Sequence, residues 1–476
     1  MKEYNILLDR PSITWVTEKG IDSRVDSEYY SSIYLRKQLI EQQNQMEYTE
    51  LGDLGDGFSY GTPPYGHLTE EGIPYLRIPN IEDEYFLNDN DLAFIDKEYH
   101  IQNIRNEVYE GDILFRIKGQ LGQALVVPRK YSGSHTGSSF LKFTPKSIDP
   151  HYLVLYLSSS YGRNQILRKQ SNSIIKYLNI DDIRSIQVPI HSLVIQRLIG
   201  NKLRKAEDLK KDANKVKEKA EQLIYKKLGF LNLDEDKQYS SAFIPSHKII
   251  DRIDSEYYNI RYLNIEEEFE KRGYKIKTLD ELCTRIYNGK TYSTSIKESK
   301  YINIGVGELG DWFINKNSEK FINDTINKKY CLKKNSIIWG NAAHLAKYIG
   351  EKVNMIFEDD VLIPTTEVTA IEPNEEVIDP YYLFLFMRSQ WGYYQIQRTV
   401  KGMTAHSYPQ DIERILVPII ELTTEEKEKL KNYVLKSFTN EVLAKQLIQE
   451  AKQDVEDLIE GNFDMSKLNE TTTESR

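Results

Sequence analysis

The sequence predicts an α+β protein with two tandem domains of the same fold, separated and followed by long helices that pair as an antiparallel coiled coil. Three observations lead to this prediction: the chain repeats itself at a fixed offset, a heptad pattern closes each repeat, and short apolar runs lie between these features. With 476 residues the chain is also too long for one hydrophobic core, so more than one domain is expected.

The repeat is clearest in two pairs of segments. Arg24–Tyr30 (RVDSEYY) returns as Arg252–Tyr258 (RIDSEYY), at an offset of 252 − 24 = 228 residues. Ile148–Leu153 (IDPHYL) returns as Ile378–Leu383 (IDPYYL), at an offset of 378 − 148 = 230 residues. Because the order of the segments is also preserved, the two halves of the chain are predicted to share one fold.

The middle of each half has diverged. Residues 52–140 and 280–370 share little beyond short apolar runs, such as Gly111–Phe115, Ala124–Val127 and Asn335–Trp339, which are predicted as buried strands. Matched segments around a diverged middle favour a common scaffold that presents a different surface in each half. Simple duplication followed by drift is the alternative.

Two helices are predicted to begin at equivalent places in the halves, at Asp149-Pro150 and at Asp379-Pro380. Aspartate caps the free N–H groups of a first helical turn, and proline is tolerated in that turn because its missing N–H is not needed there.

Each half ends in a heptad pattern that indicates a coiled-coil seam. The predicted pairing residues are Ile199, Ala206, Leu209, Ala213, Val216, Ala220 and Leu223 in the first helix, and Leu430, Val434, Ala444, Ile448, Ala451, Val455 and Leu458 in the second. Residues 191–230 carry eleven Lys or Arg against five Asp or Glu, whereas residues 421–460 carry six against ten, so the two helices should attract each other. The alternative is that each is a solvated charged helix.

These patterns divide the chain into five parts. A first domain is predicted at 1–190, a central helix at 191–232, a second domain at 233–420, a C-terminal helix at 421–462 and a disordered tail at 463–476.

Composition favours a cytoplasmic protein. No apolar run approaches the roughly 20 residues that cross a bilayer, and the first ten residues lack the apolar stretch of a signal peptide. The two cysteines, Cys283 and Cys331, cannot form a disulfide framework. A net charge of −9 argues against nucleic-acid binding unless basic residues are concentrated on one face.

Each candidate catalytic or metal-binding motif in the sequence lacks a residue or a spacing that its chemistry requires. Thr62–Tyr65 (TPPY) is similar to the Pro-Pro-aromatic motif of amino-methyltransferases, but threonine cannot accept the amine proton as an acid or amide does. Gly289–Thr291 (GKT) resembles the end of a phosphate loop, yet Thr284 stands where the leading glycine belongs. The eight histidines lack the spacing of a metal site. No catalytic residue and no metal is therefore predicted.

What remains is a set of polar and aromatic residues on presumed loops, of the types that read bases and hold phosphates. In the first half these are Ser59, Tyr60, Thr62, Arg77, Asn80, Arg116, Lys118, Gln120, Gln123, Lys176 and Tyr177. In the second half they are Asn288, Lys290, Tyr292, Asn303, Asn341, His344, Lys347, Lys401, Thr404 and His406. For each residue taken singly, an ordinary surface role is the alternative.

Two variable domains alternating with two heptad helices resemble the specificity subunits of type I restriction-modification systems. Gly72–Arg77 (GIPYLR) and Gly111–Phe115 (GDILF) with the glycines that follow are similar to the recurring frame of that family's target-recognition domains. The second half departs from this frame at Gly305–Gly307 and Trp339–Asn341.

The resemblance implies a non-catalytic, sequence-specific DNA-binding subunit for restriction-modification in antiviral defence. Each target-recognition domain would read one half of a bipartite target in double-stranded DNA, and the paired helices would set the spacing between the halves. The implied partners are two methyltransferase (modification) subunits and the restriction (translocase-endonuclease) subunits. No cofactor is expected in this chain, because S-adenosylmethionine, ATP and Mg would be bound by the partner subunits.

Two other functions stay open at this point. One is the specificity subunit of a related system whose restriction and modification activities share a partner chain. The other is a duplicated coiled-coil scaffold that does not bind DNA. The genes beside this one would separate the first alternative from a type I system.

Overall fold

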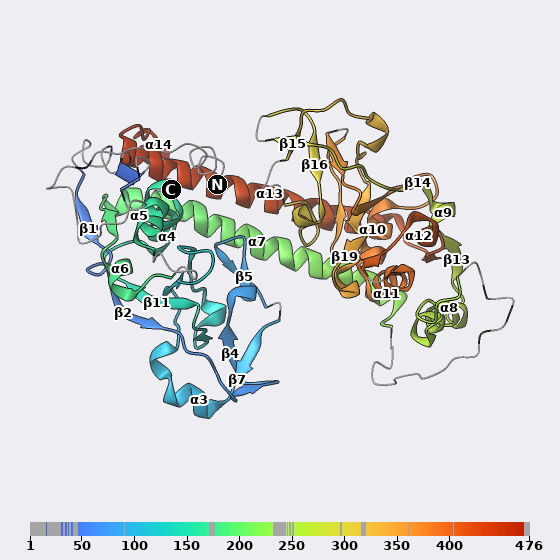
Figure 1. Ribbon diagram of the computed structural model, residues 1–476, viewed down its shortest axis with the longest axis horizontal. Coiled ribbons are helices and arrows are strands. Elements are labelled where there is room, and N and C mark those ends of the chain that lie inside the picture. Colours follow the sequence, from blue (N-terminus) through green and yellow to red (C-terminus); the bar gives the residue numbers. More distant parts are fainter. Residues whose placement is uncertain are drawn as a thin grey trace. The chain divides into compact units, whose positions relative to one another are not determined.

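The structure is a computed structural model that describes residues 46–470 apart from 90, 171–176, 232–243, 245, 247–248, 250–251, 296–297, 316–319, 360 and 403, together with 16, 30, 31, 34, 35, 37 and 40. It divides into two units. Unit 1 is Met1–Lys211 with Asn440–Arg476, and unit 2 is Asp212–Thr439. The long helices α7 (Leu193–Leu228) and α13 (Thr424–Glu460) contribute one part to each unit (Figure 1).

Unit 1 contains two four-stranded sheets. The inner sheet is antiparallel, in the order β2 (Gly55–Tyr60), β11 (Phe140–Pro145), β8 (Ile113–Arg116) and β9 (Ala124–Val126). The outer sheet has the order β10 (His135–Thr136), β4 (Ile73–Leu76), β7 (Ala93–Ile95) and β3 (Leu68–Thr69), with β10 parallel to β4. Two-stranded pairs join β1 (Tyr48–Glu50) to β12 (Gln187–Pro189) and β5 (Ile81–Glu82) to β6 (Phe86–Leu87).

Helices cover one face of the inner sheet. Outside α7 and α13, the described α-helices of unit 1 include α3 (Lys97–Gln102), α4 (Pro150–Ser158), α5 (Ser160–Lys169), α6 (Ile180–Arg184) and α14 (Lys467–Glu470). Short 3-10 helices are η2 (Ile78–Asn80), η3 (Ile104–Asn106) and η4 (Arg129–Tyr131). The predicted cap is confirmed, since the Asp149 carboxylate accepts hydrogen bonds from the backbone N–H groups of His151 and Tyr152.

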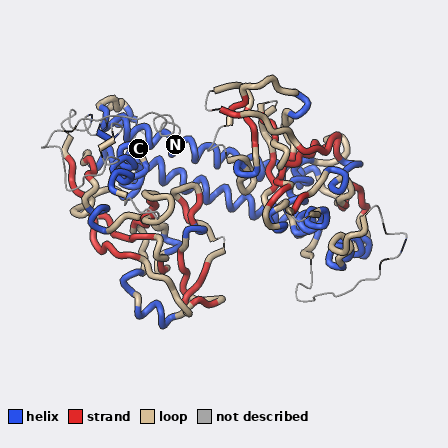
Figure 2. The backbone as a smooth tube through the Cα atoms, viewed as in Figure 1, coloured by secondary structure: helices blue, strands red, loops and turns tan. Residues whose placement is uncertain are grey.

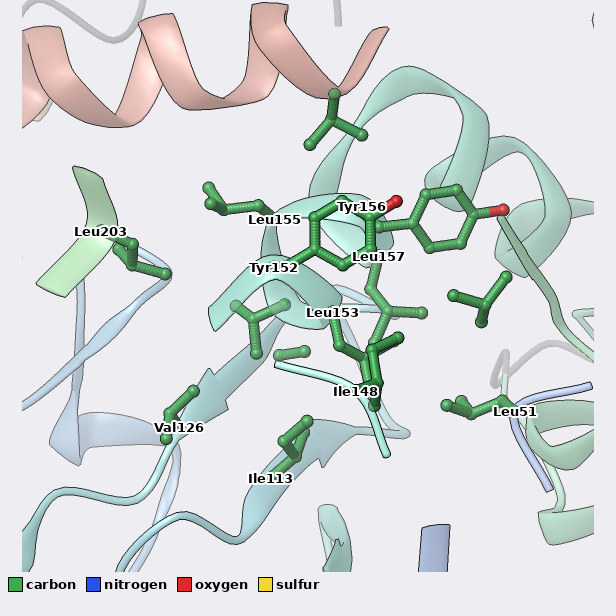
Figure 3. Close-up of a cluster of buried hydrophobic side chains, with 14 of the residues drawn as sticks. Leu51, Ile113, Val126, Ile148, Tyr152, Leu153, Leu155, Tyr156, Leu157 and Leu203 are labelled. Carbon is green, nitrogen blue, oxygen red and sulfur yellow. The ribbon is translucent and has the colours of Figure 1, made fainter. Parts of the chain in front are cut away.

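The strand period of two separates the inner sheet into two buried faces. Ile113 and Phe115 of β8 point into the core formed with α4 and the helices α7 and α13. Leu114, between them, belongs to a second cluster on the side of the outer sheet. Figure 3 shows the first core, in which Tyr152 of α4 and Leu203 of α7 lie in the same cluster as Ile113.

Unit 2 has the same strand arrangement. Its inner sheet has the order β14 (Cys283–Asn288), β22 (Val368–Pro373), β18 (Ile337–Gly340) and β20 (Val353–Met355). Its outer sheet has the order β15 (Thr294–Ser295), β17 (Phe321–Ile322), β16 (Ile302–Ile304) and β21 (Leu362–Pro364), again with one parallel pair, β16 with β21. Two further pairs join β13 (Lys275–Thr278) to β24 (Leu416–Ile419) and β19 (Ala342–Ala343) to β23 (Ala405–His406).

The helices of unit 2 complete a mixed helix and sheet fold (Figure 2). They are α8 (Ile260–Lys271), α9 (Leu279–Leu282), α10 (Pro380–Arg388), α11 (Gln390–Thr399) and α12 (Pro409–Ile412), with 3-10 helices η6 (Val306–Glu308), η7 (Lys328–Tyr330) and η8 (Ala346–Tyr348). The second predicted cap is also confirmed, because Asp379 accepts from the N–H groups of Tyr381 and Tyr382. The mixed fold class is therefore as predicted. No helix in the described part of the chain is long and apolar enough to cross a membrane.

The buried stripe of α7 contains the first predicted series of residues but only Val216 of the second predicted series. The series Ile199, Ala206, Ala213 and Ala220 is fully buried as expected. The second series follows at four residues rather than three, through Leu203, Lys210, Lys217 and Ile224. Of the positions predicted instead, Val216 is buried, whereas Leu209 and Leu223 are only partly buried. The apolar pattern misses this stripe because two of its members are lysines.

The predicted seam of α13 is buried throughout, from Leu430 to Leu458. Within unit 1 the Lys202 ammonium lies 2.6 Å from the Asp454 carboxylate and 3.4 Å from Glu450. Within unit 2 the Lys227 ammonium lies 2.8 Å from Glu426. Ion pairs of the expected sign therefore join the basic helix to the acidic one in each unit.

Residues 463–470, predicted as part of a disordered tail, are ordered in the structure. Phe463 is buried in the core of unit 1, and the Lys467 ammonium of α14 lies 2.7 Å from the Asp454 carboxylate. These contacts order the residues just beyond α13, because they bury an aromatic ring and neutralise a buried acid. Residues 471–476 lie outside the described residues, as do residues 24–29 of the first repeated segment.

Candidate nucleic-acid interface

Three segments carrying predicted DNA-binding residues meet at one edge of unit 1. In the inner sheet, Leu141 pairs with Tyr60 and Phe140 with Arg116, so β2 and β8 end on either side of the start of β11. The loop after β8 is joined to the segment after α5 by a β-bridge between Lys118 and Tyr177. The hydroxyl of Tyr60 accepts a hydrogen bond of 2.8 Å from the N–H of Ile180, in the same segment as Tyr177.

Unit 2 forms the same edge from equivalent segments. Asn288, at the end of β14, pairs with Thr369 of β22, and Gly340, at the end of β18, pairs with Val368. The loop after β18 then pairs with the segment after α11 through β19 and β23. The Thr369 hydroxyl donates to Asn288 at 2.7 Å and accepts from Asn341 at 3.1 Å, which ties the strand ends together.

A glycine marks the point where the first strand leaves each sheet. A Cβ atom on Gly61 would lie 2.3 Å from the carbonyl oxygens of Thr136 and Gly137. A Cβ atom on Gly289 would lie 1.9 Å from the Pro364 carbonyl oxygen. Only glycine permits such close backbone approach, so both edges are shaped at the same place by the same means.

An open hollow lies beside the edge in unit 1. Its volume is about 700 Å³, and it is lined by Gly57, Phe58, Ser59, Tyr60, Thr62, Arg105, Lys142 and Ile180. Its walls combine hydroxyl groups, aromatic rings and two cations, which suits contact with a sugar-phosphate backbone. Arg105 and Lys142 were missed by the sequence analysis because each stands alone among unrelated residue types. Proximity to Ser59 and Tyr60 in space is the only signal that finds them.

The Thr62 backbone and hydroxyl are held in a polar network. The Tyr75 hydroxyl donates to the Thr62 carbonyl at 2.6 Å, and the Asn106 amide donates to the Thr62 hydroxyl at 3.0 Å. The Thr62 hydroxyl also forms a short hydrogen bond with Tyr99. Thr62 therefore positions the wall of the hollow.

A pair of histidines lies behind this network. Nδ1 of His100 is 2.9 Å from Nε2 of His135, which has no exposed surface. Burial, reinforced by the neighbouring His100, lowers the pKa of His135 to about 4. His135 is therefore neutral at pH 7. Across the described residues, no three His, Cys, Asp or Glu side chains are grouped so that they could hold a metal ion.

Three predicted DNA-binding residues serve the fold instead. Asn80, Asn303 and Asn341 are buried, with exposures of 0%, 1% and 2%. The Asn80 side chain accepts from the Arg77 N–H, and the Asn303 amide donates to the Ile363 carbonyl. A side chain without exposed surface cannot reach a base edge in this conformation, so we remove these three from the set.

Three predicted cations already have partners. A terminal nitrogen of Arg77 is 3.0 Å from the Asp91 carboxylate, and the Lys401 ammonium is 2.8 Å from Asp411. Arg116 donates to the Gln123 side chain at 2.7 Å. Contact between these groups and DNA requires that the partner be shared or exchanged.

The other predicted residues within the described part of the chain keep exposed surface. Tyr60, Lys118, Gln120, Tyr177, Lys290, His344, Lys347 and Thr404 are exposed, and Ser59, Thr62, Gln123, Asn288, Tyr292 and His406 are half-buried. Lys176 lies outside the described residues. DNA contact by any of them stays a prediction.

Part of the chain is similar in sequence to known proteins. A family model described as the type I restriction modification DNA specificity domain matches residues 43–222. The specificity subunit of the type I restriction enzyme EcoBI from Escherichia coli is 27% identical over 161 residues, which are 33% of this chain. The matched stretch spans 34% of that curated relative, about a third of its length.

Two solved structures are similar to this chain at low sequence identity and low TM-score. The S subunit of a type I restriction-modification system from M. genitalium has 14% sequence identity and a TM-score of 0.42, over 89% of this chain and 96% of that one. The HsdS subunit from Thermoanaerobacter tengcongensis has 12% identity and a TM-score of 0.30, over 88% and 97% of the two chains.

Proposed function

We propose that the chain is the non-catalytic, DNA-reading specificity subunit of a type I restriction-modification complex, because residues 43–222 match a family model described as the type I restriction modification DNA specificity domain. Each unit would contain one target-recognition domain, and each domain would read one half of a bipartite target. The observation that carries the proposal is the recurrence of one edge, built from three equivalent segments, in both units.

The chemistry of the exposed residues supports contact with duplex DNA. The ammonium groups of Lys118, Lys290 and Lys347 can neutralise phosphates. The side chains of Gln120 and His344 present hydrogen-bond donors and acceptors that suit base edges. The net charge of −9 then predicts weak binding by the isolated chain at physiological salt, because few phosphates are neutralised by this subunit alone.

We further propose that α7 and α13 pair as an antiparallel coiled coil that acts as the spacer between the halves of the target. The supporting contacts join the start of α7 to the end of α13 in unit 1, and the end of α7 to the start of α13 in unit 2. A helix of 36 residues is about 54 Å long, which exceeds one turn of duplex.

The outer faces of these helices are proposed to dock two methyltransferase subunits, which restriction subunits would join. Exposed apolar residues in the middle of α13, Val442 at 46% and Leu443 at 38%, fit such a docking face. S-adenosylmethionine, ATP and Mg would then act in the partner subunits, while this chain supplies the choice of DNA sequence.

Methylation mapping tests the function. The chain is co-expressed with the products of the neighbouring genes, and methylated adenines are located by long-read sequencing. We expect a gapped motif, of which one half changes when residues 240–415 are exchanged for those of another second domain. The absence of any motif, or its persistence without both domains, would contradict the proposal.

Substitution of one lysine tests the proposed edge. Lys118→Ala is expected to weaken DNA binding by the assembled complex about threefold to tenfold at all sequences, and to reduce the salt slope by about one. Lys118 is exposed, and its β-bridge to Tyr177 uses only backbone atoms, so the fold should persist. Lys146→Ala is the matched control, because Lys146 follows the far end of β11 and pairs with Asp56. An equal loss in both variants would contradict the assignment of the edge.

A further inference from the structure

Two lysines occupy core positions of α7 where the heptad pattern calls for apolar side chains. The side chains of Lys210 and Lys217 are only 8% and 9% exposed. Burying an ammonium group is costly unless it is paired, and an apolar residue at the same position would pack without that cost. The contacts of each lysine within its own unit explain why it is there.

In unit 1, Lys210 binds the tip of the β5–β6 hairpin. Its ammonium lies 2.7 Å from the Glu82 carboxylate and 3.0 Å from that of Asp83. The ammonium also lies 5.7 Å from the centre of the Phe86 ring. Burial opposes the charge on Lys210, but Glu82, Asp83 and Glu441 outweigh it and raise the pKa of the ammonium. The lysine is therefore charged in the folded protein.

The rest of the hairpin tip is held as well. Asp83 and Glu84 both adopt positive φ angles, of 49° and 71°, which only a tightly held turn sustains in residues other than glycine. Glu84 lies 2.7 Å from a terminal nitrogen of Arg163 on α5, and the Tyr85 hydroxyl donates to Ser158 on α4 at 2.7 Å.

The same hairpin connects the layers of unit 1. Ile81 and Leu87, in its stem, pack against the cluster between the inner and outer sheets. Tyr85 and Phe86, at its tip, pack into or against the core beneath the helices. The hairpin thus runs from the outer sheet, past the inner sheet, to α7.

Unit 2 repeats the arrangement with different residues. A β-bridge between Leu309 and Ile314 closes a hairpin, and both residues pack on the cluster beside the outer sheet. Trp312 and Phe313, at the tip, lie in the core beneath the helices. The Asp311 carboxylate lies 2.8 Å from the Lys217 ammonium.

Asp311 has a second cation. Arg388 of α10 lies 2.8 Å from its carboxylate, in addition to Lys217. The Asp311 side chain keeps 60% of its surface exposed, and although partial desolvation opposes the charge, Arg388 and Lys217 lower the pKa of its carboxyl to about 2. Each hairpin also begins at an equivalent place, directly after η2 in unit 1 and directly after η6 in unit 2.

We propose that Lys210 and Lys217 are positioning residues that fasten an acidic hairpin in each unit to α7, and so set the orientation of the outer sheet beside the candidate DNA-reading edge. Both hairpins have an apolar stem on the outer layer, aromatic side chains in the inner core and a carboxylate on a buried lysine. Two different sequences thus reach the same arrangement, which favours selection for the connection itself. The link to DNA reading rests on the proposed function.

Hydrogen exchange of the full chain tests the fastening without reference to DNA. In Lys210→Met, amide exchange across residues 81–88 should become about tenfold faster, while residues 309–315 keep their rate. Lys210→Arg should restore the slow exchange, because it keeps the charge. Lys217→Met should accelerate amide exchange at residues 309–315 by less than about tenfold, since Arg388 still holds Asp311. The double variant Lys217→Met with Arg388→Met should accelerate exchange there about tenfold.

The matched control is Lys202→Met, which removes a lysine of α7 that binds α13 rather than a hairpin. Unchanged exchange at residues 81–88 in Lys210→Met, or equal acceleration there in Lys202→Met, would overturn the proposal.

A functional measurement separates positioning from mere stability. In the complex with partner subunits, Lys210→Met should lower discrimination against base changes about fivefold in the half-motif read by unit 1 and leave the other half-motif unchanged. An equal loss in both halves, or a loosened hairpin with unchanged discrimination, would overturn the positioning role. If exchange in Lys210→Met is faster as expected but the wild-type complex methylates no gapped motif, the proposed function is refuted while the contact between Lys210 and the hairpin stands.

Discussion

Replacing Trp391 by alanine is expected to lower the free energy of unfolding of unit 2 by about 4 kcal/mol. The indole is fully buried, stacks on Phe269 at a centroid distance of 4.8 Å, and donates to the Gly229 carbonyl at 2.9 Å. Truncation leaves a cavity in the core and an unpaired carbonyl at the end of α7. Trp391→Phe keeps most of the stacking and should cost about 1–2 kcal/mol, chiefly through the lost hydrogen bond.

Chemical denaturation of the full chain measures this effect. Three of the four tryptophans, Trp312, Trp339 and Trp391, lie in unit 2, so tryptophan fluorescence reports mainly on that unit. Tyr348→Ala is the control, because this ring is 49% exposed and its loss should cost less than about 0.5 kcal/mol. A cost for Trp391→Ala as small as that of the control would show that the ring does not belong to the core.

Acidification from pH 6.5 to about pH 4 is expected to lower the free energy of unfolding of unit 1 by about 3 kcal/mol through protonation of His135 in the unfolded chain alone. The pKa of this side chain is lowered from the usual 6.5 to about 4 by burial and by His100. Between these values the unfolded chain binds a proton that the folded chain does not, so stability falls as pH falls. Above pH 6.5 both states are neutral and the effect vanishes. Glu107, which favours the charged form, and Lys142, which opposes it, face the same ring.

The comparison of the wild type with His135→Asn isolates the contribution of His135 to the pH dependence of stability. Peptide-resolved hydrogen exchange of β8 is followed at pH 7.5, 6.5 and 5.5, with intrinsic exchange rates corrected for pH. The wild type should lose about 1.4 kcal/mol more than the variant for each pH unit below 6.5. His344→Asn, at an exposed site, should leave the slope as it is in the wild type. Parallel slopes for the wild type and His135→Asn would refute the assignment.

Local patterns predicted the parts of this fold that depend on neighbours in the chain. The strand at Gly111–Phe115 appears as β8, and the predicted caps at Asp149 and Asp379 hold α4 and α10. The seam of α13 follows its heptads at the predicted apolar positions, while the heptad position between Leu430 and Ala444 is the buried polar residue Ser437. The sequence repeat predicted that the two units share a topology, because matched segments precede and follow the strand-forming residues in the sequence of both halves.

The candidate site was predicted as a list of single residues on presumed loops. The ends of β2 and β8 and the segment after α5 meet, and Tyr60, Lys118 and Tyr177 lie in these segments, but DNA contact by these residues stays a prediction. Asn80 and Asn341 were chosen by residue type, but they satisfy backbone and side-chain partners inside the fold. Residue type alone cannot separate an amide that reads a base from one that holds a loop, because both roles use the same donor and acceptor.

The sequence by itself determined the duplication, the mixed fold, the helix starts and the acidic and basic character of the two long helices. The duplication is recorded by matched segments 228 and 230 residues apart, and the other features by spacing or composition within a short window. Only the tertiary structure decided the seam of α7, where Lys210 lies in the buried stripe although it looks like a surface residue. Its partner Glu82 stands 128 residues earlier in the chain, and no local pattern records a pairing over that separation. Which polar side chain is buried depends on the partner that folding brings to it.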